Sequence, residues 1–353
     1  MTATREDSAY RQAGVDIDAG SRAVDLMKNA VRSTFGPNVL ADIGLFGGLY
    51  ALDERPDGQV LVSSADSVGT KLNLASVLGS HRLLGHDIVN HCANDILACG
   101  ARPIFFLDYF AAGKIVPEQV ADVVTGMAEA CRAAGAALVG GETAELPGIY
   151  ASGQFDVVGF IVGTVARDRL VLGDTITVGD IVLALPSNGL HTNGYTLARK
   201  VFSLDTDPDT TKERLTAFHP GLNRTLGEAL TEPHRGYLPE ISPLLDKPER
   251  PIKGMAHITG GGLTDNIPRV LPAGTAVELN TTSWEMPPLF KLIQSEGNIP
   301  DSEMRRVFNV GLGMIVIVSP DHIEMVMNSS PNFMKVGAVI KQTGDDRVVF
   351  QSW

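Results

Sequence analysis

Hydrophobic positions in the first half of the chain switch between helical and strand-like spacing. Helical spacing predicts helices at Ser21 to Phe35 and at Pro117 to Ala134, where Pro117 suits a first helical turn. Apolar runs typical of strands lie between and after these helices, at Val60 to Ser64, Pro103 to Phe110, Ala136 to Val139 and Phe155 to Val165. The pattern predicts an α/β fold for this half.

The second half repeats the mixture after a polar stretch from Ala166 to Asp180, where we place a boundary between domains 1–170 and 171–353. Helices are predicted at Asn193 to Ser203, Leu222 to Thr231, Gly262 to Val270 and Pro287 to Glu296. Strands are predicted at Ile181 to Leu185, Gly311 to Val318, Val336 to Ile340 and Arg347 to Gln351. The segment Asp205 to Thr211 is interpreted as a surface loop. Two α/β domains with a cleft between them follow.

Length and charge narrow the classes of function. The chain has 353 residues, enough for two domains that each bury a core. Its 29 basic and 41 acidic side chains give a formal charge of -12, which disfavours nucleic acid as a partner. The three cysteines form neither a disulfide framework nor a zinc motif, and no segment resembles a signal peptide or membrane span. We expect a cytoplasmic protein without a membrane partner.

A first candidate site follows the apolar run that ends at Ser64. Asp66, Gly69, Thr70 and Lys71 lie within six positions there. A carboxylate, a flexible turn and a lysine suit a metal-bridged phosphate, although an ordinary turn with a solvated ion pair explains them equally well. The pattern is not a Walker A motif.

Two further carboxylates could join this site. Helical spacing over Arg82 to Cys99 carries Asp95 toward the interior, where it would need a metal or a lysine, unless it lies at a solvated helix end. His91, one turn earlier, is interpreted as structural. Glu142 follows a double glycine at a predicted strand end, a favoured position for ligand contacts. Together Asp66, Asp95 and Glu142 form a candidate set of oxygen ligands for Mg²⁺.

The second half adds two glycine-containing segments. In the first, His191 lies in a loop where packing gives little reason for it, and it could titrate near neutral pH, whereas Asn193 is either a ligand contact or a helix N-cap. In the second, the triple glycine Gly260, Gly261, Gly262 stands between a predicted strand and helix, so its backbone N–H groups could hold a phosphate, or the loop could simply be flexible.

These segments, in order, resemble the AIR synthetase (phosphoribosylformylglycinamidine cyclo-ligase) family over essentially the whole chain. The resemblance rests on YRQAGVDIDAG at Tyr10 to Gly20, FGPNVL at Phe35 to Leu40, DSVGTKL, NDILACGARPIFFLDYFA at Asn94 to Ala111, GGETAELPG, GLHTNGYTL, HITGGGL and FNVGLGM at Phe308 to Met314. No one segment would suffice. Ser67 and Leu45 replace glycines that are usual in the family, and Asp265 replaces a glutamate, which leaves loop detail open.

The resemblance implies a two-domain α/β (α+β) fold, with an N-terminal mixed sheet that completes a barrel across a homodimer and a C-terminal α/β domain that closes the site. It implies ATP-dependent conversion of formylglycinamidine ribonucleotide to aminoimidazole ribonucleotide through phosphorylation of the amide oxygen, with Mg²⁺. Lys28, Asp66, Lys71, Asp95 and Glu142 would serve nucleotide and metal, together with Gly69, Thr70 and the triple glycine. Lys71, Asp95, His191 and Asn193 would be catalytic.

Two alternatives stay open at this stage. Another ATP-dependent phosphotransferase of the same superfamily is one, although a selenophosphate synthetase would carry an early reactive cysteine and a hydrogenase maturation protein a C-terminal one. Here the first cysteine is Cys92 and the chain ends in FQSW. A non-catalytic nucleotide-binding protein is the other, and the presence of Lys71, Asp95 and His191 argues against it.

Overall fold

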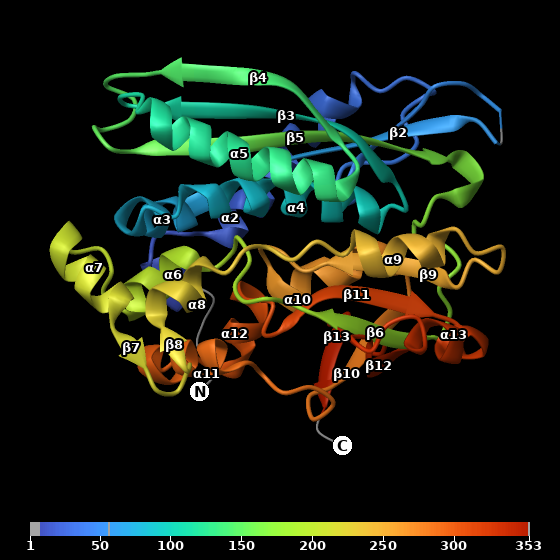
Figure 1. Ribbon diagram of the computed structural model, residues 1–353. Coiled ribbons are helices and arrows are strands. Elements are labelled where there is room, and N and C mark those ends of the chain that lie inside the picture. Colours follow the sequence, from blue (N-terminus) through green and yellow to red (C-terminus); the bar gives the residue numbers. More distant parts are fainter. Residues whose placement is uncertain (1–7, 56, 352–353) are drawn as a thin grey trace.

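Two mixed sheets with helices between them build the molecule (Figure 1). The computed structural model describes residues 8–55 and 57–351. The first sheet has the order β1-β2-β5-β3-β4, formed by β1 (Gly48–Ala51), β2 (Gln59–Ser67), β3 (Arg102–Ala112), β4 (Ala137–Glu145) and β5 (Phe155–Ala166). Only β3 and β4 are parallel, and α5 (Pro117–Ala134) makes the crossover between them.

The second sheet, in the order β13-β10-β12-β6-β11-β9, contains the rest of the long strands. These are β6 (Ile181–Pro186), β9 (Ile252–His257), β10 (Thr275–Asn280), β11 (Leu312–Val318), β12 (Met334–Lys341) and β13 (Val348–Gln351). A short ribbon joins β7 (Phe218–His219) to β8 (Arg224–Thr225). The predicted mixed α/β architecture in two parts is confirmed, and the division near residue 170 stays a prediction.

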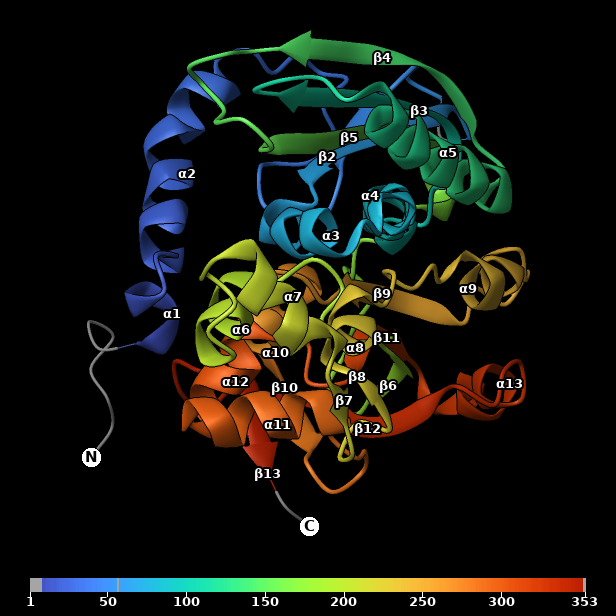
Figure 2. The same ribbon diagram turned by 60° about the vertical axis from the view of Figure 1, so that its left-hand side comes forward.

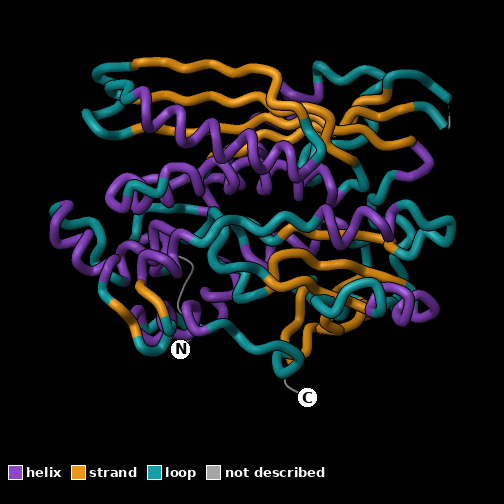
Figure 3. Tube along the Cα trace, viewed as in Figure 1, coloured by secondary structure: helices purple, strands orange, loops and turns teal. Residues whose placement is uncertain are grey.

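Helices fill the space between the sheets and flank the second one (Figure 3). Between the sheets lie α3 (Leu72–Leu78) and α4 (His81–Ala98), with α5 against the first sheet (Figure 1). The second half carries α6 (Tyr195–Val201), α7 (Pro208–Thr216), α8 (Leu226–Thr231), α9 (Leu238–Leu245), α10 (Gly262–Asn266), α11 (Pro288–Gly297), α12 (Asp301–Val307) and α13 (Ile323–Met327). No helix of the described residues is long and apolar enough to cross a membrane.

The N-terminal segment runs along one side of both halves. Helix α1 (Ala9–Gln12) lies by the second half, where the Tyr10 backbone N–H donates to Glu303 at 2.9 Å. Helix α2 (Ile17–Arg32) then rises along the side of the molecule toward the first sheet, as Figure 2 shows. The N-terminal segment therefore spans the two halves.

The structure corrects several predicted elements, among them the helix predicted from Leu222, which begins only at Leu226 after β8. The segment Asp205 to Thr211 is not a loop, because α7 starts at Pro208 with the Asp207 carboxylate capping it through the Thr210 N–H. Strand β4 does not end before the double glycine, since it continues to Glu145. A Cβ on Gly141 would lie 2.2 Å from a carboxylate oxygen of Asp108 on β3, so this glycine serves close strand packing.

Helices α4 and α5 cross in direct backbone contact because glycines stand at the crossing. A Cβ added to Gly126 on α5 would lie 1.9 Å from the Arg82 carbonyl oxygen, and one added to Gly85 on α4 would lie 2.2 Å from the Val123 carbonyl oxygen. Any larger residue must push the helices apart. The close crossing holds α4 in its place under the first sheet.

We predict that Gly126→Ala lowers the free energy of unfolding by about 1 to 3 kcal/mol, because the methyl group overpacks this crossing. The matched control is Gly20→Ala in α2, where a Cβ meets no atom within 4 Å and should raise stability by about 1 kcal/mol through helix propensity. Urea unfolding followed by circular dichroism measures both. Equal unfolding midpoints for wild type and Gly126→Ala would contradict the close backbone contact between α4 and α5 at this position.

Candidate active site

Helix α4 carries polar side chains into the interior between the two sheets. Leu84, Ile88 and Cys92 are fully buried, as the sequence predicted, but so are Asp87, His91 and Asn94 on other faces of the same helix, and Asp95 is only 7% exposed. Polar groups in such surroundings need hydrogen-bond partners. Their partners come from β2 and from loops of the second half.

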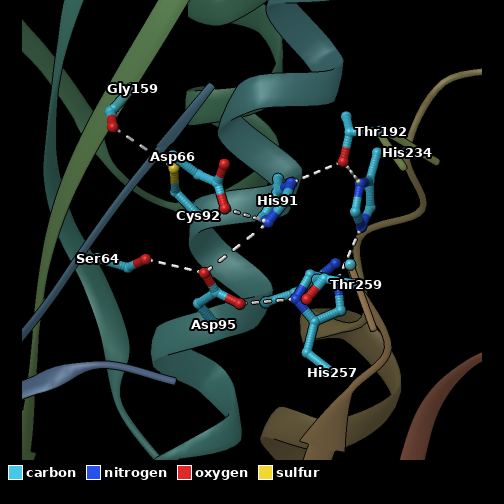
Figure 4. Close-up of polar contacts among 12 residues, drawn as sticks. Ser64, Asp66, His91, Cys92, Asp95, Gly159, Thr192, His234, His257 and Thr259 are labelled. Atoms are coloured by element: carbon cyan, nitrogen blue, oxygen red, sulfur yellow. Dashed lines mark hydrogen bonds and ion pairs between the residues drawn. The ribbon is translucent and has the colours of Figure 1, made fainter. Parts of the chain in front are cut away.

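Strand β2 supplies the first partners because its inward face changes from apolar to polar near its end. Val60 and Val62 fill the core, and Ser64 and Asp66 continue the same face toward α4. The Ser64 hydroxyl donates to Asp95 Oδ2 at 2.8 Å, and Asp66 Oδ2 lies 2.8 Å from His91 Nε2 (Figure 4). Two of the three predicted carboxylates therefore meet beside one histidine.

The second half completes the surroundings of Asp95. His257, at the end of β9, lies with Nδ1 2.8 Å from Asp95 Oδ1. A carboxylate only accepts, so His257 holds its proton on Nδ1. Both Asp95 oxygens are thus engaged, and the alternative of a solvated helix end is wrong. The cation that the sequence required nearby is provided by histidine rather than lysine.

His91 is the charged member of this group. Burial lowers its pKa, but the Asp66 carboxylate and, less strongly, Asp95 and Asp87 outweigh burial and raise the pKa to about 9. In turn, the His91 charge overcomes the effect of burial on Asp66 and lowers the pKa of that carboxyl. The sequence interpretation of His91 as merely structural missed this pairing.

Two more histidines extend the group. His234 Nε2 lies 2.9 Å from His257 Nε2, and the ring of His191 stacks on His234 with 3.9 Å between centroids. Burial lowers the pKa values of His191 and His234 well below their usual value, and neighbouring positive charges lower them further. His191 lies in a loop as predicted, but it is fully buried and its pKa is strongly lowered. The prediction that it titrates near neutral pH is therefore wrong, while its catalytic role stays a prediction.

Lys71 is buried in an ion pair in this structure. Its ammonium is fully buried, 2.7 Å from Asp87 Oδ2, and it also donates to the Glu232 carbonyl at 2.8 Å. Burial lowers the pKa of Lys71 and raises that of Asp87, and the mutual attraction of the pair only partly opposes both shifts. Lys71 thus joins the two halves in this structure, and its predicted catalytic role stays a prediction.

The same face of α4 holds a backbone segment of the second half. Asp87 Oδ1 accepts from the His234 N–H at 2.7 Å, and Asn90 donates to the His234 carbonyl at 2.7 Å. Asn94 donates to the Arg235 carbonyl at 2.8 Å and accepts from the Tyr237 N–H at 3.0 Å. These side chains and Lys71 hold residues 232–237, which we call the docked segment.

The other residues predicted to contact the nucleotide come from three separate loops that lie beside each other. The Thr70 hydroxyl is 3.0 Å from that of Thr196 in α6, and a Cβ on Gly69 would lie 3.7 Å from the Thr192 carbonyl. A Cβ on Gly260 would lie 3.1 Å from Asn193 Oδ1. Gly194, not Asn193, is the N-cap of α6, so the capping alternative for Asn193 is wrong.

Backbone conformation and close packing explain why two of the three consecutive glycines are glycine. Gly261 and Gly262 have φ of 95° and 58°, and a Cβ on Gly262 would lie 2.1 Å from the Arg305 carbonyl of α12. Gly260 has neither restriction of φ nor a backbone contact of this kind. Ser67 lies in regular β2 and is not among the described residues with positive φ, so replacing the usual glycine causes no strain there.

Two predicted residues lie apart from the histidines. Lys28 is on α2 and pairs with Asp25 at 2.7 Å. Glu142 is on the edge strand β4, opposite Tyr109, and three strand spacings separate it from the corresponding position Ser67 on β2, about 14 Å. Its register also places it on the opposite face of the sheet from Asp66. The three carboxylates do not come together within this chain.

Comparisons with known proteins bear on both halves. The AIR synthase related protein models match residues 47–165 for the N-terminal domain and residues 177–349 for the C-terminal domain. A phosphoribosylformylglycinamidine cyclo-ligase from Desulfitobacterium hafniense is 50% identical over 90% of this chain and 91% of its own length. The one from Carboxydothermus hydrogenoformans is 46% identical over 98% of this chain and 99% of its own length.

The chain belongs to the phosphoribosylformylglycinamidine cyclo-ligase family. Solved structures with low identity share its fold. A thiamine monophosphate kinase from Aquifex aeolicus has a TM-score of 0.61 at 13% identity, covering 94% of this chain and 96% of its own. T. maritima PurL complexed with ADP has a TM-score of 0.57 at 15% identity, covering 90% of this chain and 45% of its own.

Sequence reasoning about this family member missed His234, His257 and the docked segment. His257 opens the HITGGGL block, and the spacing His91 to Asp95 places both on one helical face, which was the available signal. Nothing local marks Asp87 as the partner of Lys71. The contacts of His234 with Asp87 and of His257 with Asp95 join segments more than a hundred residues apart.

We predict that Lys71→Met lowers the free energy of unfolding by about 3 to 5 kcal/mol, because it leaves Asp87 buried without its cation. Asp87→Asn alone leaves Lys71 unpaired, whereas Lys71→Met with Asp87→Asn removes both charges and keeps an acceptor for the His234 N–H. The double variant should therefore lose less stability than the sum of the two single changes.

Urea unfolding of the four proteins measures this coupling. If Lys71→Met unfolds at the wild-type midpoint and instead loses nucleotide affinity, the buried pair is contradicted and the phosphate role predicted from sequence is favoured.

Proposed function

We propose that the protein cyclises formylglycinamidine ribonucleotide to aminoimidazole ribonucleotide with ATP, in purine biosynthesis. The observation that carries this proposal is the near full-length match at 46 to 50% identity to curated cyclo-ligases. An amide oxygen is a poor leaving group, so ring closure requires its prior conversion to a phosphate ester. Such phosphoryl transfer depends on positioning and on neutralising negative charge.

The nucleotide is placed where the glycine-containing loops meet. Gly69, Thr70, Asn193 and Gly260 lie along the junction of the two halves, and their backbone can approach a phosphate closely. The ADP complex of PurL and its shared fold support a nucleotide as ligand. Lys28 and the rest of the triple glycine remain proposed contacts of the nucleotide.

Mg²⁺ accompanies ATP in this proposal and stabilises the charge of the transferred phosphate. The ion usually needs only one or two protein carboxylates, with water and phosphate oxygens as its other ligands. The Asp66 side chain is 41% exposed and fits that requirement, whereas both Asp95 oxygens are occupied by Ser64 and His257. Asp66 is therefore the proposed carboxylate of the nucleotide side.

Proton transfer to or from the substrate has two candidates, His191 and a carboxylate. Complete burial and a strongly lowered pKa disfavour His191. Asp66 is partly exposed, and the charge of His91 lowers its pKa overall. A carboxylate that holds Mg²⁺ and pairs with a charged histidine is a poor proton acceptor, so Asp66 keeps the metal role alone. His191 has a supporting role, because it packs on His234 and so fixes the histidine group.

A homodimer is proposed from the open face of the first sheet. Helices α4 and α5 cover one face, while Val139 of β4 and Phe160 of β5 are exposed at 59% and 38%. A groove of about 620 Å³ runs along this face, lined by Phe35, Tyr50, Leu61, Phe160 and Val162 among others. An apolar face next to an unpaired edge strand suits association with a second copy of the chain. In such a dimer, strand β4 with Glu142 lies beside the interface. A cytoplasmic location is part of the same proposal.

The activity test uses purified protein, Mg-ATP and formylglycinamidine ribonucleotide, with diazotisation of the aminoimidazole product. We predict turnover by the wild type and a loss in kcat of about 100-fold or more for Asp66→Asn, because removing one group that stabilises charge at the transferred phosphate costs about 10² to 10³. The control Asp122→Asn changes an exposed carboxylate on α5 and should keep full activity. ATP binding without product in the wild type would favour a non-catalytic nucleotide-binding protein.

We predict further that Phe160→Glu converts a dimer into a monomer, because it places a charge in an apolar interface. The control is Phe218→Glu, which changes a phenylalanine 63% exposed on the second half. Sedimentation equilibrium measures the mass. A monomeric wild type, or a Phe160→Glu variant that stays dimeric, would contradict the proposed interface.

A further inference from the structure

A cleft of about 570 Å³ opens at the junction of the two halves, away from the histidine group. Residues of the segment 167–175, the end of α9 and the start of β9 line it. Ile252 of β9 lines the cleft, whereas His257, at the other end of the same strand, lies about 17 Å further along beside Asp95. In Figure 1, α9 and α13 lie at this end of the molecule, opposite α6 and α7. The cleft is therefore separate from the candidate active site.

The lining of the cleft carries more basic than acidic side chains, although the whole chain has a formal charge of -12. Arg250 pairs with Asp168 at 2.6 Å, and Lys253 pairs with Asp180 at 2.8 Å, so these two cations are neutralised. A local excess of positive charge attracts anions even to an acidic protein. The charged side chains of the lining are Arg167, Arg169, Arg250 and Lys253 against Asp168 and Asp174.

Two arginines of the cleft have no carboxylate partner, and both are half-buried. Among the described residues, none forms a hydrogen bond or an ion pair with the Arg167 guanidinium. Arg169 donates to the Lys247 carbonyl at 3.1 Å. Asp174, the other acidic residue of the lining, is exposed and pairs with neither arginine. A guanidinium presents its N–H groups as a planar fork that matches the oxygens of a phosphate.

Much of the remaining lining is apolar. Leu40, Leu170, Leu172 and Leu245 are partly buried and pack against the core while they also line the cleft. The volume of about 570 Å³ falls within the range of about 300 to 1,000 Å³ that is usual for small-molecule sites. An isolated phosphate ion would leave most of this space and all of its apolar surface unused. The cleft therefore suits an anion that is attached to an apolar ring.

We infer that this cleft binds a phosphate monoester carrying a flat ring, of the nucleoside monophosphate class. Arg167 and Arg169 hold the phosphate, and the ring lies on the leucines. The site is separate from that of ATP and does not rest on the proposed function. Because its lining comes from both halves of the chain, an occupied cleft should raise the melting temperature of the whole protein.

Titration calorimetry of the full chain with AMP tests this site, with adenosine and ribose 5-phosphate as probes that lack the phosphate or the ring. We expect AMP to bind more tightly than either probe and to raise the melting temperature. Arg167→Gln should weaken AMP binding by about 10- to 100-fold, because it removes a charged hydrogen-bond donor. Arg167→Lys keeps the charge and should bind AMP more tightly than Arg167→Gln.

The control Arg132→Gln makes the same change of charge at the exposed end of α5 and should bind AMP as the wild type does. All three variants should keep the wild-type affinity for a non-hydrolysable ATP analogue with Mg²⁺, which distinguishes the cleft from the ATP site. Wild type without saturable AMP binding, equal AMP affinity in Arg167→Gln, or a parallel loss of affinity for the ATP analogue would overturn the inference. Equal affinities for AMP and ribose 5-phosphate would overturn the role of the ring.

Discussion

Helix α4 is buried along most of its length while carrying Asp87, His91, Asn94 and Asp95, and this constraint organises the molecule. Each of these polar groups would cost several kcal/mol if it lost water without gaining a partner. Their partners lie largely in the second half, in the docked segment and at His257. Separating the halves would leave the polar groups of α4 without partners. These hydrogen bonds therefore fix how the two halves pack together.

The same constraint determines the chemistry available at the junction. Because Asp66 and Asp95 flank His91, that imidazole is held charged, while burial keeps His191 and His234 neutral. The cluster thus has one principal positive charge, on His91. Loops that face outward from it, around Thr70, Asn193 and Gly260, remain available for a nucleotide. Phosphoryl transfer depends on positioning, and these loops lie directly beside the buried polar cluster.

The sequence pattern predicted those features that depend on neighbouring residues, such as helix boundaries and buried helix faces. Pro117 and the helical spacing after it placed α5 correctly, and the spacing through Asp95 predicted its burial. Asp207 and Pro208 also form a helix start, but their composition was interpreted as a loop. The partner of Asp95 lies 162 positions away, and Glu142 is directed by strand register to the other face of the sheet. Neither follows from spacing, because both depend on which segments the fold brings together.

The central claim is that α4 holds the docked segment through buried hydrogen bonds. Native-state hydrogen exchange of the backbone amides of His234 and Tyr237, which donate to Asp87 and Asn94, tests it most directly. We expect these amides to exchange as slowly as those in the centre of α4, although they lie in a loop without regular structure. Exchange at the rate of an exposed loop, with α4 still protected, would contradict the account.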